Sequence, residues 1–324
     1  MQLSALTCID VDQCLRGPDG IFFIISSILE HRKNVMSGSV PCKIMLATDL
    51  TPAGDRAFDR ALQLALQWNA ELTVCHVIES SALRPWGIER RVRNAEIEFE
   101  RLVHSAKIDR RIPRHIVVGD PAERTLEHAR AIDCDFLITG PAHGKILGDK
   151  LLGSTAARIV RRATQPVLAV RRRPEGEYRT IVAAVDFSEP SKAALLRGRA
   201  LFPSARLSAL HAYQVSPNWS GPNADKSIDV VEAEERRRVV TLAEQDMADL
   251  LASVAGDRSP IETALLEGTP EAALAEFVDS KWPDLVIAGT HGRSGHQQDS
   301  IGSVSEFLLT MLPCDVLAVP TRGQ

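Results

Sequence analysis

The sequence predicts an α/β protein made of two units, each with a five-stranded parallel sheet flanked by helices. Short runs that are apolar throughout alternate with segments of helical period, as expected when strands are buried on both faces. The same order of elements occurs twice along the chain. The length of 324 residues, with 44% apolar and 25% charged residues, is typical of globular chains with about two domains.

The first unit begins with the strand KIMLATDL (43–50), which contains Asp49 near its end and leads through a Thr-Pro turn into a helical stretch. Asp120-Pro121 is typical of a helix start, because proline is favoured at the first helical position. The other expected elements are strands at 71–78, 114–119, 135–140 and 166–170, and helices at 88–107, 121–132 and 153–163.

The second unit repeats this order. Its elements are a strand and helix over 180–201, a strand at 206–213, a helix at 228–254, a strand and helix over 261–278, and strands at 284–289 and 315–320. Asp186 follows Asp49 by 137 residues, whereas Gly289 follows Gly140 by 149. A net expansion of twelve residues therefore lies between the second and third strands, where a surface loop tolerates insertion.

The predicted domains are residues 41–173, here called the first half, and residues 174–324, the second half. The charged segment RRRPEGE (171–177) is the expected linker between them. Residues 1–40 match neither half and are expected to be a leader that is disordered or not native.

An apolar run in this leader, IFFIISSIL (21–29), is too short to span a bilayer. Asp10, Asp12 and Asp19 precede it, where a signal peptide needs positive charge. The leader is either an arm that packs on a neighbour or upstream sequence translated from a wrongly chosen start. We favour the second interpretation, with Met36 as the true start.

The composition excludes several classes of partner. Lys and Arg number 38 against 42 Asp and Glu, and aromatic residues make up 5%, so neither a basic nucleic-acid surface nor a base-stacking platform is expected. Six cysteines without paired spacing indicate reduced, mostly buried thiols, and the expected location is cytoplasmic. Because the apolar run at 21–29 is too short to span a bilayer, no membrane partner is expected. The first 173 residues hold 25 basic and 20 acidic side chains (net +5), and the rest hold 13 and 22 (net −9). Opposite charges favour docking of the two halves, although unrelated solvated surfaces would give the same counts.

The candidate binding site lies where parallel strands end. In an open parallel sheet the ligand crevice is at the carboxyl ends of the strands, and Asp49 and Asp186 occupy that place after the two first strands. The second half carries the spacing G-x2-G-x9-G-S after its fourth strand, formed by Gly289, Gly292, Gly302 and Ser303.

This spacing suits phosphate. Glycines allow backbone N–H groups to approach an oxyanion, and Gly302 and Ser303 open a helix whose dipole favours negative charge. Arg293 is a candidate partner for the same charge, and Asp186 for the ribose or adenine end of a nucleotide. The alternative is a glycine-rich turn with a serine cap and no ligand.

The first half departs from this spacing. Its loop, GPAHGKILGDKLLGST, places His143 where the second glycine is expected and displaces Gly144 by one position. A doubtful nucleotide site remains there, made of Asp49, Gly140, Gly144, Gly153 and Ser154. The alternative is a degenerate unit kept for pairing with the second half.

The segments VIAGTHGRSG, GSVSEFLL, DVLAVP and IVAAVDFSEPSKAAL resemble the universal stress protein family, and residues 42–320 resemble two such domains in tandem. The resemblance implies Rossmann-like domains of the adenine nucleotide alpha hydrolase-like type that pair through their last strands. It also implies ATP, ADP or AMP as ligand, with Mg²⁺ held mainly by the phosphates and no protein metal cluster. The second-half residues that match the family site are Ala184, Val185, Asp186, His211, Ala212, Gly289, Gly292, Arg293, Gly302, Ser303 and Val304.

The leading functional hypothesis is a nucleotide-binding stress-response protein whose output is a change of conformation or partner. No general base is evident beside the phosphate loop, so no catalytic residue is assigned. The alternatives are a slow Mg-dependent ATPase that uses Asp186, and a scaffold that binds no nucleotide. We expect the two halves to pair with each other within the chain. The other expected partners are a second copy of the chain in a homodimer and an unidentified protein.

Overall fold

The computed structural model describes residues 40–79, 85–106, 112–140, 155–216, 228–254, 260–292 and 301–320. The expected leader lies outside the described residues apart from Val40. Within the described part, no helix is long and apolar enough to cross a membrane.

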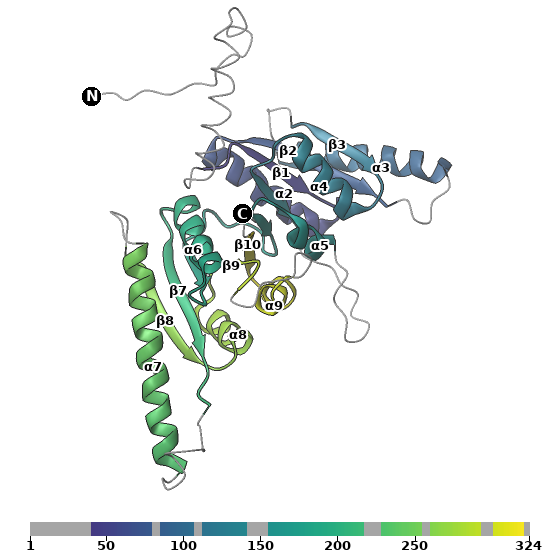
Figure 1. Ribbon diagram of the computed structural model, residues 1–324. Helices are drawn as coiled ribbons and strands as arrows, with labels where there is room; N and C mark the ends of the chain where they lie inside the picture. Colours follow the sequence, from purple (N-terminus) through teal and green to yellow (C-terminus); the bar gives the residue numbers. More distant parts are fainter. Residues whose placement is uncertain are drawn as a thin grey trace, which may run out of the picture. The chain divides into compact units, whose positions relative to one another are not determined.

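Strands and helices alternate through both halves (Figure 1). The first half comprises β1 (Lys43–Ala47), α2 (Pro52–Trp68), β2 (Glu71–Ile78), α3 (Pro85–Ser105), β3 (Arg114–Val118), α4 (Pro121–Ala131), β4 (Phe136–Thr139), α5 (Thr155–Arg162) and β5 (Val167–Ala169). The second half comprises β6 (Thr180–Ala184), α6 (Glu189–Leu201), β7 (Arg206–Tyr213), α7 (Ile228–Ser253), β8 (Glu262–Glu267), α8 (Pro270–Lys281), β9 (Leu285–Gly289), α9 (Ser303–Met311) and β10 (Asp315–Val319). The predicted α/β fold with a repeated unit is confirmed.

The ten strands of the described residues form one sheet, in the order β3-β2-β1-β4-β5-β10-β9-β6-β7-β8. Neighbours within each half are parallel, and β5 and β10 pair antiparallel, with Val316 opposite Ala169. The last strands of the two halves therefore join two five-stranded parallel sheets into one.

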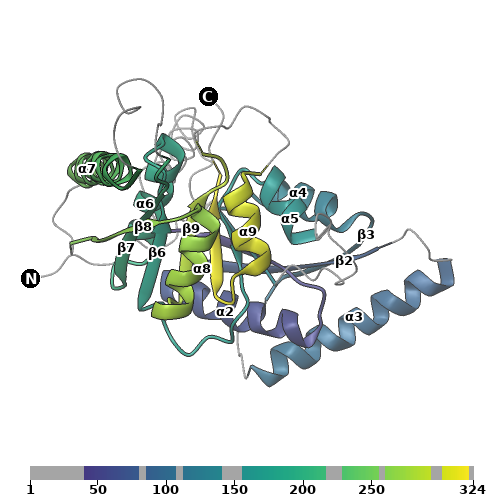
Figure 2. The same ribbon diagram turned by 90° about the horizontal axis from the view of Figure 1, so that it is seen from below.

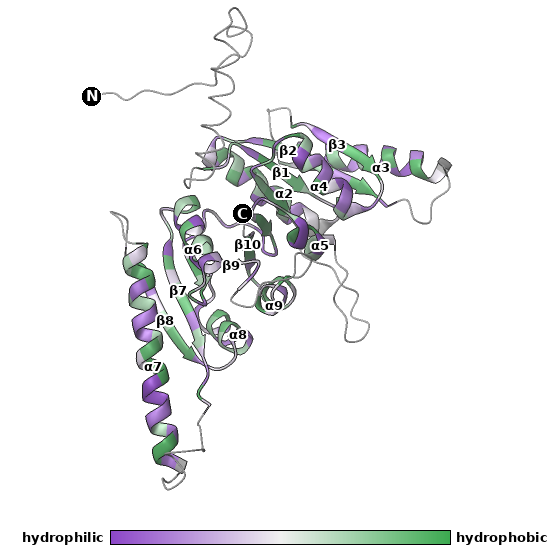
Figure 3. Cartoon of the chain, in the orientation of Figure 1, coloured by the Kyte–Doolittle hydropathy of each residue, from purple (hydrophilic) through white to green (hydrophobic). Residues whose placement is uncertain are grey.

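Helices cover both faces of the sheet because successive strand residues point to opposite sides. Ile44 and Leu46 of β1 belong to one core, which also contains buried residues of α2, α3, α6 and α7, whereas Met45 belongs to the core under α4, α5, α8 and α9. Figure 2 shows α4 beside α5 and α8 beside α9. In Figure 3 much of the sheet is green, and α7 carries long hydrophilic stretches.

The two halves share backbone details as well as element order. Leu50 and Phe187, 137 residues apart, both have a positive φ, of 57° and 64°. Polar caps start the corresponding helices: Thr51 caps α2 and Ser188 caps α6, each through its side-chain oxygen. The exits from β1 and β6 therefore follow the same path into the next helix.

A buried carboxylate, Asp315 at the start of β10, connects the halves through the linker. Its Oδ1 accepts hydrogen bonds from the backbone N–H groups of Arg171 and Arg172, at 2.7 and 3.0 Å. Its Oδ2 accepts a bond of 2.6 Å from the Tyr178 hydroxyl and lies 3.6 Å from Nε of Arg60 on α2. The Asp315 side chain thus touches the linker and the first half while belonging to the second.

Arg60 also contacts the Tyr178 ring, which directly follows the linker. The Arg60 guanidinium lies 4.0 Å from the centre of the Tyr178 ring and donates to the Gly176 carbonyl at 2.8 Å. Burial raises the pKa of Tyr178 well above its usual range, and the neighbouring Asp315 charge adds to this rise. The phenol therefore stays protonated and donates to the carboxylate.

We expect Tyr178→Phe to lower the free energy of unfolding by about 1–3 kcal/mol, because it removes a donor from a buried carboxylate. Urea denaturation measures the change. The control is Arg173→Ala, since Arg173 is 71% exposed and its ion pair with Asp59 is 3.4 Å long. This control is expected to change stability by less than about 0.5 kcal/mol. Equal losses in the two variants would contradict the assigned role of the Asp315 contacts.

Candidate functional site

The predicted second-half residues gather at the carboxyl ends of the strands. Ala184 ends β6 and is followed by Val185 and Asp186, and Gly289 ends β9. His211 and Ala212 lie near the end of β7. Gly302 is the cap of α9, and Ser303 and Val304 form its first turn. Arg293 lies outside the described residues.

Two of these residues touch across the crevice. A Cβ at Gly292 would lie only 2.6 Å from Oδ2 of Asp186, so the loop after β9 packs directly on the carboxylate that follows β6. A Cβ at Gly289 would lie 3.1 Å from the carbonyl oxygen of Pro190 in α6. Glycine at both positions lets this loop approach the exit of β6 closely.

Asp186 is fixed in a tight turn. Its Oδ1 accepts from the Ser188 N–H at 3.1 Å and from the Ser188 hydroxyl. The turn places Phe187 in the left-handed region, and the Phe187 ring centre lies 4.2 Å from that of His211. The Nδ1 atom of His211 lies 2.8 Å from the Val185 carbonyl. Because a carbonyl only accepts, Nδ1 of His211 carries the hydrogen of this bond.

The start of α9 has no side-chain cap. The Gly302 N–H donates to the Thr290 carbonyl at 3.0 Å, while the N–H groups of the first turn are the ones that an α-helix leaves without intrahelical partners. The Ser303 hydroxyl lies 3.4 Å from a carboxylate oxygen of Glu271. This helix start can receive an anion, and Glu271 would compete with it.

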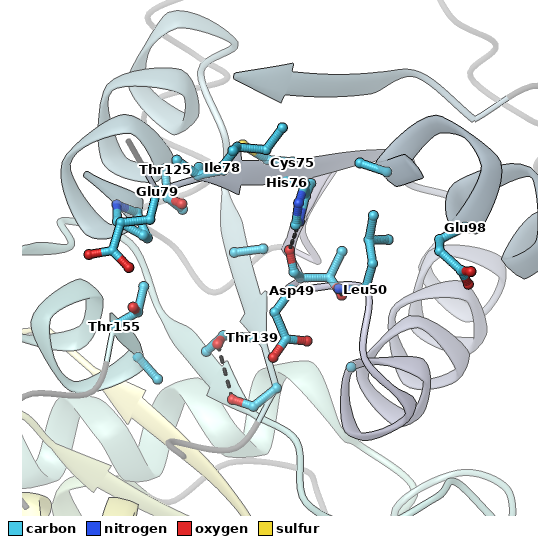
Figure 4. Close-up of a pocket in the computed structure, with 18 of the residues that line it drawn as sticks. Asp49, Leu50, Cys75, His76, Ile78, Glu79, Glu98, Thr125, Thr139 and Thr155 are labelled. Carbon is cyan, nitrogen blue, oxygen red and sulfur yellow. Dashed lines mark hydrogen bonds between the residues drawn. The ribbon is translucent and has the colours of Figure 1, made fainter. Parts of the chain in front are cut away.

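The first half contains a cavity of about 530 Å³ at the ends of β1, β2 and β4. Asp49 and Gly140 line it, whereas Gly144, Gly153 and Ser154 lie outside the described residues. In Figure 4, Glu79 and Thr155 lie on one side, Glu98 on the other, and Asp49 and Thr139 between them. The polar residues that line the cavity are Thr48, Asp49, His76, Glu79, Arg91, Asn94, Glu98, Thr125, Thr139 and Thr155.

The turn at the floor of this cavity matches that of the second half. Oδ1 of Asp49 accepts from the N–H and the hydroxyl of Thr51, at 3.0 and 2.7 Å. Nδ1 of His76 lies 2.9 Å from the Thr48 carbonyl, as His211 does beside Val185. A Cβ at Gly54 would lie 2.6 Å from the Thr48 hydroxyl, so glycine is needed where α2 passes the cavity.

The cavity thiol is not activated, and the described residues include no metal cluster. Burial raises the pKa of Cys75, which lines the cavity, to about 11, so its thiol is protonated at neutral pH. In the part of the chain that the structure describes, no three His, Cys, Asp or Glu side chains are placed to hold a metal ion.

The polar character of the first-half cavity was missed from the sequence, where the expected site there was limited to Asp49 and the glycine loop. Thr48, Thr139 and Glu79 carry no motif of their own. Comparison of the two halves could have revealed it, because the residues at the matching second-half positions are the less polar or uncharged Val185, Ala288 and Gln214.

An ion pair joins the start of α4 to α5, two helices that contribute residues to the cavity lining. Arg158 donates to both carboxylate oxygens of Asp120, at 2.7 and 2.9 Å, and Asp120 also caps α4 through Glu123 N–H. The bonds from Arg158 hold the pKa of Asp120 below its usual range, with a smaller contribution from the capping bond.

We expect Asp120→Asn to lower stability at pH 7 by at most about 1 kcal/mol, since Asn still caps the helix and the lost pair is partly exposed. A carboxyl whose folded pKa is lowered stabilises the fold above its ordinary pKa and loses that effect as the pH falls through the folded value. The difference between wild type and variant should therefore disappear in strong acid. Urea denaturation across pH checks this, with Glu127→Gln as the control for an exposed ion pair. A difference that persists at low pH would contradict the prediction.

Comparison with known proteins places both halves in one family. The family model described as "Universal stress protein family" matches residues 42–171 and 177–320. The chain is similar to "Universal stress protein A homolog 1" of Coxiella burnetii, with 35% identity over 39% of this chain and 94% of that protein.

Solved structures of universal stress proteins are similar as well. One from Archaeoglobus fulgidus is 18% identical over 86% of this chain and 98% of that chain, with a TM-score of 0.60, which shows the fold. Another, described as a universal stress protein in complex with cAMP, is 28% identical over 41% of this chain and 98% of that chain, with a TM-score of 0.31. The chain therefore belongs to the universal stress protein family and carries two of its domains in tandem.

Proposed function

We propose that the protein binds an adenine nucleotide (ATP, ADP or AMP) in its second half and acts in a cytoplasmic stress response. The observation that carries the proposal is the contact of Gly292 with Asp186 beside the uncapped start of α9. It combines a close backbone approach, a fixed carboxylate and a helix N-terminus at the carboxyl edge of the sheet.

In this proposal the phosphates lie beside Gly302 and against the N–H groups of Gly292, Ser303 and Val304, with Arg293 as the candidate cation. The nucleoside end lies beside Val185, Asp186 and His211, which bring a carboxylate and an imidazole ring to this part of the site. Ala184, Ala212 and Gly289 complete the walls.

Mg²⁺ would be held mainly by the phosphates, which supply the hard oxygen ligands it prefers. Family membership supports an adenine nucleotide as the ligand class to test, since one member is described in complex with cAMP.

The output of binding is a change of conformation or partner. Gly292 lies against Asp186, and the proposed phosphate site also includes the start of α9, so a bound phosphate chain would contact the exits of β6 and β9 together with α9. An unidentified protein partner would then bind the nucleotide-bound form and the nucleotide-free form with different affinities. A homodimer is a further expectation.

We expect Gly292→Ala to weaken Mg-ATP binding by tenfold or more, because the new methyl group would collide with Oδ2 of Asp186. Titration calorimetry on the full chain measures this. Gly140→Ala is the matched control, since a Cβ there meets only Gly54 Cα at 3.8 Å, an ordinary contact. Unchanged ATP affinity in Gly292→Ala, or no binding by the wild type, would overturn the proposal.

A binding role also predicts that phosphate release from ATP does not exceed the buffer rate. A slow Mg-dependent ATPase is the competing function, and Asp186 is the residue that would arrange its attacking water. Comparing phosphate release by wild type and Asp186→Ala separates the two. Turnover that is present in the wild type and lost in the variant would favour the enzyme.

A further inference from the structure

Four threonines line the first-half cavity at positions that are apolar in the second half. The matched pairs, set by the repeat spacing, are Thr48 and Val185, Thr125 and Leu274, Thr139 and Ala288, and Thr155 and Val304. Three of the threonines are buried, with 2–8% of their surface exposed. The two halves therefore present different chemistry at one place in the fold.

The buried hydroxyls keep hydrogen-bonding capacity for a ligand. Oγ1 of Thr48 accepts from the Leu50 N–H at 3.0 Å, which leaves its own hydrogen to donate. Thr139 donates to the Gly140 carbonyl at 3.0 Å, which leaves lone pairs on its oxygen. His76 adds an acceptor, because its Nδ1 hydrogen is used by the Thr48 carbonyl. These groups match the hydroxyls and ring nitrogens of a nucleoside.

The charges around the cavity oppose a phosphate chain. Asp49, Glu79 and Glu98 contribute three carboxylates, and Arg91 is the cation among the described lining residues. A carboxylate oxygen of Glu98 also lies 2.7 Å from Nε of Arg101, a residue that does not line the cavity. The second half has the neutral Gln214 at the position of Glu79. Like charges on the ligand and the wall repel, and the repulsion grows as the site is shielded from water.

We infer that the first-half cavity binds a nucleoside without a phosphate chain, whereas the second half takes the nucleotide. This inference rests on the proposed function for the ligand class, since it takes the nucleoside part to be common to both sites. It goes beyond that proposal by giving the two halves different ligands. The first half recognises ribose and base through threonine hydroxyls and rejects polyphosphate through Glu79, which is the neutral Gln214 in the second half.

The test uses the full chain with adenosine and ATP as probes in titration calorimetry. Wild type is expected to bind one equivalent of adenosine in the presence of saturating ATP. The double variant Thr48→Val/Thr139→Ala carries the second-half residues and should bind adenosine about tenfold more weakly or worse, with ATP binding unchanged. Circular dichroism melting confirms that this variant is folded.

A second variant tests the charge argument on an exposed side chain. Glu79→Gln should raise the affinity of the first half for AMP relative to its affinity for adenosine, with a difference that shrinks in high salt. Absence of adenosine binding, two equivalents of bound ATP in the wild type, or full adenosine affinity in the double threonine variant would each overturn the inference. Failure of the proposed function would show separately, as loss of ATP binding while adenosine still binds.

Discussion

The buried carboxylate of Asp315 is the constraint on which the joined sheet depends. A charge that is fully removed from water must be satisfied by nearby donors, because leaving it unpaired costs several kcal/mol. Its donors come from the linker backbone and Tyr178, and Arg60 on α2 of the first half adds the opposite charge. The contacts of this one carboxylate therefore hold the linker backbone, α2 and the start of β10 together.

The same backbone frame carries two different sites. Leu50 and Phe187 adopt a left-handed conformation that costs a bulky side chain about 1–2 kcal/mol, and an Asp turn holds each of them. The histidine that follows on the next strand is tied to a carbonyl in both halves. What differs is the lining, where hydroxyls in one half replace apolar side chains in the other. The geometry of the turn determines where a ligand can lie, and the side chains that line the site determine which chemical class of ligand can bind.

Much of the fold was predictable from local patterns. The strand expected at 71–78 is β2, and the helix expected at 228–254 is α7, because a mostly apolar run and a long charged segment rich in helix-forming residues each allow few alternatives. The role of Asp315 was not predictable, since an aspartate at the start of a strand normally lies in water and its donors are over a hundred residues away in sequence. The second-half site residues were found through glycine spacing, a strong local signal. The first-half cavity depends on threonines that are common residues with no spacing rule.

Antiparallel pairing of β5 with β10 within a single chain has a consequence for how such sites can change. In a symmetric pair of separate chains, any substitution appears in both sites at once, and the pair comes apart on dilution. Here each position occurs once and the partner strand is tethered, so the pairing does not depend on protein concentration. Asp315 itself illustrates this freedom, because the matching position in the other half is Pro166. In the fused chain, a substitution can therefore change one site without changing the other, and each molecule always contains one copy of each site.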